Sequence, residues 1–113
     1  MEHKTSSRRA QKLNELLKEV VGELLFRNID IARDTLITIS RADTSSDLKN
    51  STIYITVFPE NKEESVLTSI QKQIYILQKT LNRTLRTKPV PKLRFELDKI
   101  AKAEQKVYEA LEK

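Results

Sequence analysis

The sequence predicts an α+β fold in which three helices and three strands form a single domain. Two long stretches carry apolar residues at helical spacing, and three short stretches are rich in β-branched or alternating residues. The composition is 38% hydrophobic and 33% charged, with one glycine and three prolines, which is typical of a well-structured chain. At 113 residues the chain can form one domain with its own core and is too short for two ordinary domains.

The first helix is predicted over about residues 7–27. Ser6 and Ser7 are suitable caps for its start. Its apolar residues recur at i, i+3, i+4 and i+7, and they are Leu13, Leu16, Leu17, Val20, Val21, Leu24 and Leu25. Residues 1–6 precede this helix, and we expect them to form a flexible N-terminus.

A hairpin is predicted next. Residues 36–40 and 51–58 are rich in β-branched and aromatic side chains, which favour strands. Residues 43–47, between them, are turn formers whose side chains bond their own backbone. The two strands are therefore expected to pair in an antiparallel hairpin, and Pro59 is expected to end the second strand.

The second half of the chain predicts a long helix, a strand and a shorter helix. From about Asn61 an apolar stripe runs to the prolines at 89 and 91, and its members are Val66, Leu67, Ile70, Ile74, Leu77, Leu81 and Leu85. Leu93, Phe95 and Leu97 then alternate with charged residues, which predicts a third strand. Residues 99–113 form a weaker amphipathic helix or tail. Helices on one face of a small mixed sheet are the simplest architecture for this order.

The charge is distributed unevenly. No acidic residue occurs in residues 65–95, and this block holds seven basic ones: Lys72, Lys79, Arg83, Arg86, Lys88, Lys92 and Arg94. Taking these seven from the 21 basic residues leaves 14 against all 16 acidic ones, so the remainder of the chain is slightly acidic. A local positive field of this kind favours polyanions, above all nucleic acids.

Helical projection gathers part of this block on one face. At 100° per residue four cations lie within about 60° of one another, opposite the apolar stripe, and they are Lys72, Lys79, Arg83 and Arg86. Tyr75 and Ile76 lie beside them and could pack on a base or ribose. A second cluster, Arg8, Arg9 and Lys12, begins the first helix, where the helix terminus also favours anions. The alternatives are a solvated helix face and a frayed terminus.

Enzymatic chemistry is not indicated. Without cysteine there are no disulfides or thiolate metal sites, and the single histidine is His3. No metal-ligand spacing or phosphate loop occurs, and Glu60, Glu63 and Glu64 suit the start of a helix. We expect a cytoplasmic monomer that has no cofactor, metal, small-molecule substrate or membrane span.

Four segments together resemble the bacterial ribosome-binding factor A family. They are Arg8-Arg9, Arg33-Asp34, the hairpin region made of ITISRAD (37–43) followed by SDLKNSTIYITVF (46–58), and VPKLRFELD (90–98). The resemblance covers about residues 8–98. It implies a type II KH-like RNA-binding domain over residues 7–98 and a non-catalytic assembly factor. Such factors bind the small (30S) ribosomal subunit and its 16S rRNA during late maturation and processing, and they support growth in the cold.

The chain departs from the family pattern where the backbone would approach RNA. A KH module clamps RNA with a Gly-x-x-Gly loop, and the one glycine of this chain is Gly22. The family's Ala-x-Gly kink would fall on Gln73, Ile74 and Tyr75, where neither small residue occurs. We therefore expect a mild or displaced kink, a helix that runs nearly straight through residue 86, and RNA contact by cationic side chains.

Three hypotheses about function follow. The first is binding of ribosomal RNA by the residue 65–95 cations, helped by Arg8, Arg9 and Lys12. The second is docking of the same surface on an acidic protein partner without RNA contact. The third, a small DNA-binding domain, is weaker because no recognition helix follows a short helical turn.

Overall fold

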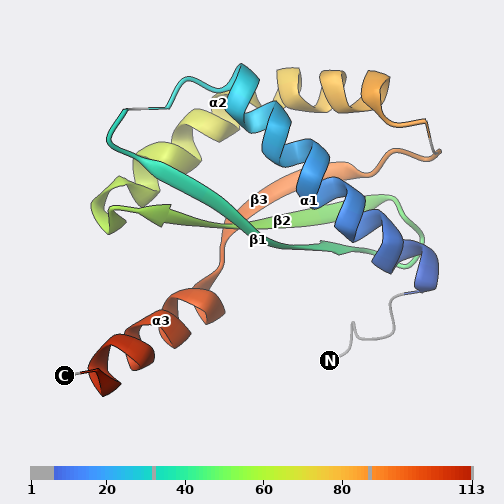
Figure 1. The fold of residues 1–113 in the computed structure, drawn as a ribbon. Helices are drawn as coiled ribbons and strands as arrows, with labels where there is room; N and C mark the ends of the chain where they lie inside the picture. The colour runs from blue at the N-terminus through green and yellow to red at the C-terminus, as the bar shows by residue number, and fades with distance from the viewer. Residues whose placement is uncertain (1–6, 32, 87, 113) are drawn as a thin grey trace.

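The computed structural model describes residues 7–31, 33–86 and 88–112. The elements follow one another as α1 (Arg8–Asn28), β1 (Leu36–Thr44), β2 (Asn50–Phe58), a 3-10 turn (Glu60–Lys62), α2 (Glu63–Thr84), β3 (Lys92–Leu97) and α3 (Lys99–Leu111) (Figure 1). The predicted order of helices and strands is therefore confirmed, and so is the α+β class. The flexible N-terminus predicted for residues 1–6 lies outside the described residues.

The three strands form one mixed sheet in the order β1-β2-β3. β1 and β2 are antiparallel, as the hairpin prediction required, and β3 runs parallel to β2. α1 and α2 both pack on the same face of this sheet (Figure 1). This arrangement places the start of α1, the β1–β2 turn and the end of α2 at one end of the molecule.

The core lies between this sheet face and the two long helices. The apolar stripes predicted for both helices supply it, because Leu17, Val21, Leu77 and Leu81 are all buried. Alternate residues of the strands face them, and these are Ile53, Ile55, Val57, Leu93 and Phe95.

The first strand is longer than predicted. We expected it to end at residue 40 and a turn to occupy residues 43–47, whereas β1 continues to Thr44 and the turn lies at 45–49. The pairing shifts by one residue between Ile39 and Arg41, after which Arg41 stacks on the Tyr54 ring at 3.8 Å from its centroid. These cross-strand contacts extend the pairing into residues that were predicted as turn formers.

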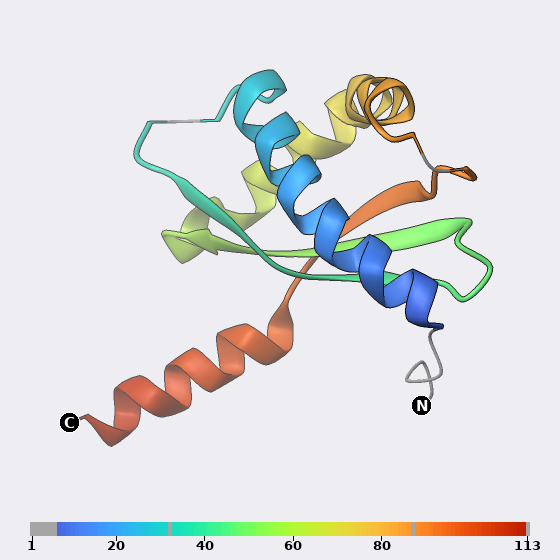
Figure 2. The same cartoon turned by 45° about the vertical axis from the view of Figure 1, so that its right-hand side comes forward.

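α2 is one continuous helix whose two halves point in different directions (Figure 2). The expectation that this helix runs nearly straight is therefore wrong. The helix also ends earlier than residue 86, at Thr84, with Leu85 as its C-cap. Within the helix, the Gln73 side-chain amide donates to the Ser69 carbonyl at 3.5 Å. That carbonyl is the acceptor four residues earlier, so this side chain competes with the helical bond in the middle of α2.

α3 does not join the other two helices. It leaves β3 on the opposite side of the sheet (Figure 2), so the expectation of helices on one face holds only for α1 and α2. Asp98 caps α3 by accepting from the Ala101 N–H at 2.9 Å, and Ser40 and Arg41 of β1 also donate to its carboxylate. Lys102 binds Glu60 and Glu63. Polar contacts therefore attach α3, and none of its described residues is buried.

Candidate nucleic-acid interface

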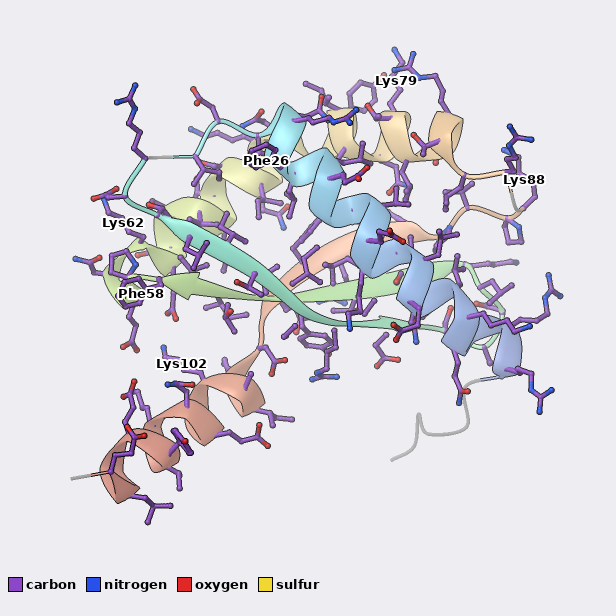
Figure 3. The ribbon with its side chains drawn as sticks, in the orientation of Figure 1. Phe26, Phe58, Lys62, Lys79, Lys88 and Lys102 are labelled. Carbon is purple, nitrogen blue, oxygen red and sulfur yellow. The ribbon has the colours of Figure 1, made fainter. Side chains whose placement is uncertain are left out.

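The outer face of α2 carries three exposed cations, Lys72, Lys79 and Arg83. They lie opposite the buried residues Val66, Ile70, Leu77 and Leu81. The predicted solvent-facing row is met for these three residues, and Figure 3 shows Lys79 pointing away from the molecule. Its fourth predicted member, Arg86, lies beyond the end of α2 at Thr84 and is therefore not on the helix face. Tyr75 and Ile76, on the same helix, are 72% and 48% exposed, so an aromatic ring and an aliphatic side chain accompany the charges.

The segment after α2 is held against the helix by one glutamine. Gln78 donates to the Pro91 carbonyl at 3.0 Å and accepts from the Leu93 N–H at 2.9 Å. The side chain of Leu85 is buried and anchors the end of α2. Between these fixed points the chain presents Arg86 and Lys88, both exposed, and Figure 3 shows Lys88 beyond the end of α2, the helix that carries Arg83. The last turns of α2 and the segment after it therefore both carry exposed cations.

The start of α1 lies beside the segment that follows α2. Ser7 caps the helix by accepting from the Ala10 N–H at 3.1 Å. Arg9 and Lys12, from the first turns, and Lys88, from the segment after α2, line one hollow of about 230 Å³. Arg8 is exposed on the same helix turn. The fold thus brings together two clusters that lie some 76 residues apart in the sequence, taking Lys12 and Lys88.

Lys49 is a cation that sequence reasoning missed. It is exposed in the β1–β2 turn, and its carbonyl accepts from the Lys92 N–H at 2.8 Å, so Lys49 and Lys92 are neighbours. Lys49 lies outside residues 65–95 and follows turn-forming residues, so the sequence analysis did not count it among the candidate binding residues. The signal that could have found it is the parallel pairing of β2 with β3, because this pairing places the starts of both strands side by side.

Arg94 is separated from the other cations. Leu93 and Phe95 of β3 are buried against the helices, so Lys92 and Arg94 point to the opposite face of the sheet. Arg94 also pairs with Glu96 of the same strand at 2.9 Å. Lys92 remains at the turn beside Lys49, but Arg94 belongs to the open sheet face.

We call the gathered set the cationic end. It consists of Arg8, Arg9, Lys12, Lys49, Lys79, Arg83, Arg86, Lys88 and Lys92. Within residues 7–31, 33–86 and 88–112, no ion pair joins any of these side chains to a carboxylate. Asp47, in the same turn as Lys49, accepts instead from the Ser45 hydroxyl at 2.6 Å and the Lys49 N–H at 3.0 Å. These bonds also lower the pKa of Asp47.

Other chemistry finds little support in the part of the chain that the structure describes. No group of three histidine, cysteine, aspartate or glutamate residues there is placed to hold a metal ion. No described helix is long and apolar enough to cross a membrane. Glu60 and Glu63, which the sequence analysis assigned to the start of a helix, bind Lys102. These hydrogen bonds, with the Lys102 charge, lower the pKa of Glu60.

The topology and the cationic end define a small α+β protein of KH-like architecture with its cations gathered at one end. The family model described as ribosome-binding factor A matches residues 9–111, and the chain therefore belongs to the ribosome-binding factor A family. A ribosome-binding factor A from Prochlorococcus marinus (strain NATL1A) is 35% identical over 97 residues, which are 83% of this chain and 79% of that protein.

Two known structures have the same fold. The crystal structure of ribosome-binding factor A from Thermus thermophilus is 25% identical, with a TM-score of 0.68 over 78% of this chain and 94% of that chain. A Thermus thermophilus ribosome-binding factor A homology model gives a TM-score of 0.63 at 25% identity, covering 74% of this chain and 88% of that one. That second structure was fitted into a cryo-electron microscopy map of a complex with the 30S subunit.

Proposed function

We propose that this protein binds the small ribosomal subunit and its 16S rRNA during late maturation and processing, as a non-catalytic assembly factor. The observation that carries this proposal is the convergence of cations from three separate segments at one end of the fold. Phosphate groups are the natural partners of such a surface, because Lys and Arg side chains that lack carboxylate partners release counterions when they meet phosphates.

The manner of binding follows from what this chain lacks. Without the Gly-x-x-Gly loop, the backbone has no glycine at which to approach a nucleotide closely. Side chains must therefore make the contacts: Arg83, Arg86 and Lys88 to phosphates, and Tyr75 to a base or ribose by stacking. Lys72 lies nearer the middle of α2 and extends this surface. Arg94, paired with Glu96, contributes least.

Family membership supports the choice of ribosomal RNA as the polyanion. The fitted 30S complex of the Thermus thermophilus relative supports the small subunit as the particle. Under this proposal the protein acts in the cytoplasm as a monomer, uses no cofactor or small-molecule substrate, and supports growth at low temperature. The KH-like domain spans residues 7–98, and residues 99–113 form an appended helix.

Charge reversal tests the proposal. The triple variant Lys79→Glu, Arg83→Glu and Arg86→Glu is expected to abolish co-sedimentation with small subunits while circular dichroism stays unchanged, because all three side chains are exposed. The matched control reverses three exposed cations away from the cationic end, Arg27, Arg33 and Lys99, and should still co-sediment. Undiminished co-sedimentation of the first variant would overturn the proposal.

Ribonuclease treatment distinguishes RNA binding from docking on an acidic protein. Digestion of a cell extract should release the protein from its complexes if RNA holds it. Complexes that survive complete digestion of the RNA would instead favour an acidic protein partner at the cationic end.

A further inference from the structure

The outer edge of β1 is an unprotected strand edge. β1 pairs with β2 alone, so alternate backbone N–H and C=O groups on its other side point away from the sheet. Among the described residues, no backbone hydrogen bond outside the regular elements involves Leu36–Ile39. Natural edges are usually blunted by lysine, proline or a bulge. This four-residue stretch has neither lysine nor proline, and the bulge begins only after Ile39.

A hollow lies on each side of this edge. The larger, of about 980 Å³, opens between the second half of α1 and β1 and is lined by Leu25, Phe26, Ile37 and Ile39, among others. The smaller, of about 590 Å³, opens between the sheet and α3. Leu36 and Thr38 line both. Since successive side chains of a strand point to opposite faces, a strand added at β1 would place alternate side chains in the two hollows.

Exposed apolar side chains mark the same place. Phe26 is 90% exposed, Phe58 71% and Leu36 62%, and Leu36 is the cross-strand partner of Phe58. Figure 3 shows Phe26 on the α1 side of the sheet and Phe58 at the far end of β2. Large apolar side chains exposed together are typical of interaction sites. They flank the β1 edge on both faces and could anchor the side chains of an added strand.

The charge around the edge is opposite to that of the cationic end. The larger hollow is lined by Glu15, Glu19 and Asp30 against Lys18 and Arg33. The smaller is lined by four carboxylates and two cations, and these are Glu60, Glu63, Asp98, Glu109, Lys102 and Lys106. Three of these seven carboxylates, Asp98, Glu60 and Glu63, already bind Arg41 or Lys102. The other four, Glu15, Glu19, Asp30 and Glu109, have no ion-pair partner among the described residues. These four negative charges repel phosphates and favour a positively charged partner.

We propose that the β1 edge docks an extended basic segment of another polypeptide by strand addition. Its backbone pairs with Leu36–Ile39, its apolar side chains pack on Phe26 and Leu36, and its lysines or arginines lie beside the carboxylates that the described cations leave unpaired. This site is distinct from the cationic end, so it would hold a protein segment while RNA is bound elsewhere. The inference does not depend on the RNA proposal.

The test uses the full chain and a six-residue peptide of alternating lysine and valine, acetylated and amidated at its ends. Binding is measured by titration, and amide hydrogen exchange is followed by NMR. The peptide is expected to slow exchange of the outward-facing amides within Leu36–Ile39. A peptide with proline in place of one central valine cannot complete the ladder and should give no such protection.

Matched variants locate the site. Leu36→Lys combined with Thr38→Lys places cations on the edge and should weaken peptide binding about tenfold or more. Ile100→Lys combined with Val107→Lys adds the same charge on exposed positions of α3 and should leave peptide affinity within about twofold. Phe26→Ala, which adds no charge, should weaken it by a smaller factor. Binding without protection of the β1 amides, or protection by an oligoribonucleotide instead, would overturn the proposal.

Discussion

The two ends of the molecule use their charges in opposite ways. Where α3 meets the sheet, Arg41 and Lys102 are joined to Asp98, Glu60 and Glu63, and these contacts hold the helix in place. At the cationic end no side chain of the set is paired with a carboxylate of the described residues, and the Ser7 cap of α1, the hydrogen bonds of Gln78 and apolar burial hold the structure. Charges at the first end therefore stabilise the fold, whereas charges at the second end are available for a ligand.

Among the substitutions that test this difference, Asp98→Ala is expected to have the largest effect on stability. The carboxylate is 4% exposed and accepts from Ser40, Arg41 and the Ala101 N–H, so its loss removes three hydrogen bonds and the cap of α3. We expect the free energy of unfolding to fall by about 2–3 kcal/mol. Urea denaturation measures it, with Asp34→Ala as control, since Asp34 is 72% exposed and 4.0 Å from Lys62. A loss below about 0.5 kcal/mol would contradict the structural role.

A second prediction concerns the pH dependence of the same contact. Burial raises the pKa of Asp98, but hydrogen bonds from Ser40 and the Ala101 N–H and the Arg41 charge outweigh it, so the pKa lies below the usual 3.8. The folded protein thus prefers the ionised form. Its contribution to stability is complete above pH 3.8 and is lost as the pH falls through the lower, folded-state pKa.

The stability difference between the wild type and Asp98→Asn should therefore shrink below about pH 4. Urea unfolding of both proteins at a series of pH values measures it. Lysine and arginine do not titrate in this window, so the difference between the wild type and Lys79→Ala should stay constant. A difference for Asp98→Asn that is equally constant would show that the charge of Asp98 is not what matters.

A smaller effect is expected at the cationic end from Gln78→Leu. The substitution leaves the Leu93 N–H without its acceptor and frees the segment that carries Lys88. We expect a loss of about 1–2 kcal/mol in unfolding free energy, together with a few-fold weaker affinity for small subunits. Gln71→Leu, at an exposed position of the same helix, is the control and should change neither quantity. Unchanged stability in Gln78→Leu would contradict the role of Gln78 in holding this segment against α2.

The features of the two ends that depend on local periodicity could be predicted from the sequence. Helical spacing identified the buried stripe of α2 and the exposure of Lys79 and Arg83, and alternation identified β3. The length of β1 was not predictable, because it depends on Arg41 meeting Tyr54 across the bulge. Turn propensity alone therefore placed the turn two residues too early.

Contacts between distant segments explain the other differences. The position of α3 depends on Ser40 binding Asp98, which is 58 residues further along the chain. Lys49 joins the cationic end only through the pairing of β2 with β3, and Arg94 leaves it because it lies two residues further along β3 than Lys92 and pairs with Glu96. Composition located the cations, but strand pairing decided which of them lie together.

Lys79→Ala is expected to have the smallest effect on stability. It tests the difference between the two ends most directly, because only the affinity for RNA should change. The side chain is exposed and has no carboxylate partner among the described residues, so unfolding free energy should change by less than about 0.5 kcal/mol. If about four phosphates are bound, log affinity for single-stranded RNA falls with log salt at a slope of roughly −3. Removing one contact should make this slope less steep by about 0.7.

Filter binding to 16S rRNA over a series of salt concentrations measures this slope. Lys99→Ala removes an exposed cation at the start of α3, and its slope should equal that of the wild type because we propose phosphate contacts at the cationic end alone. The same change of slope in both variants would mean that overall charge, rather than the gathering of cations at one end, governs binding. A reduced slope in Lys79→Ala alone would assign the phosphate contact to α2, since both side chains are exposed and neither substitution is expected to alter the fold.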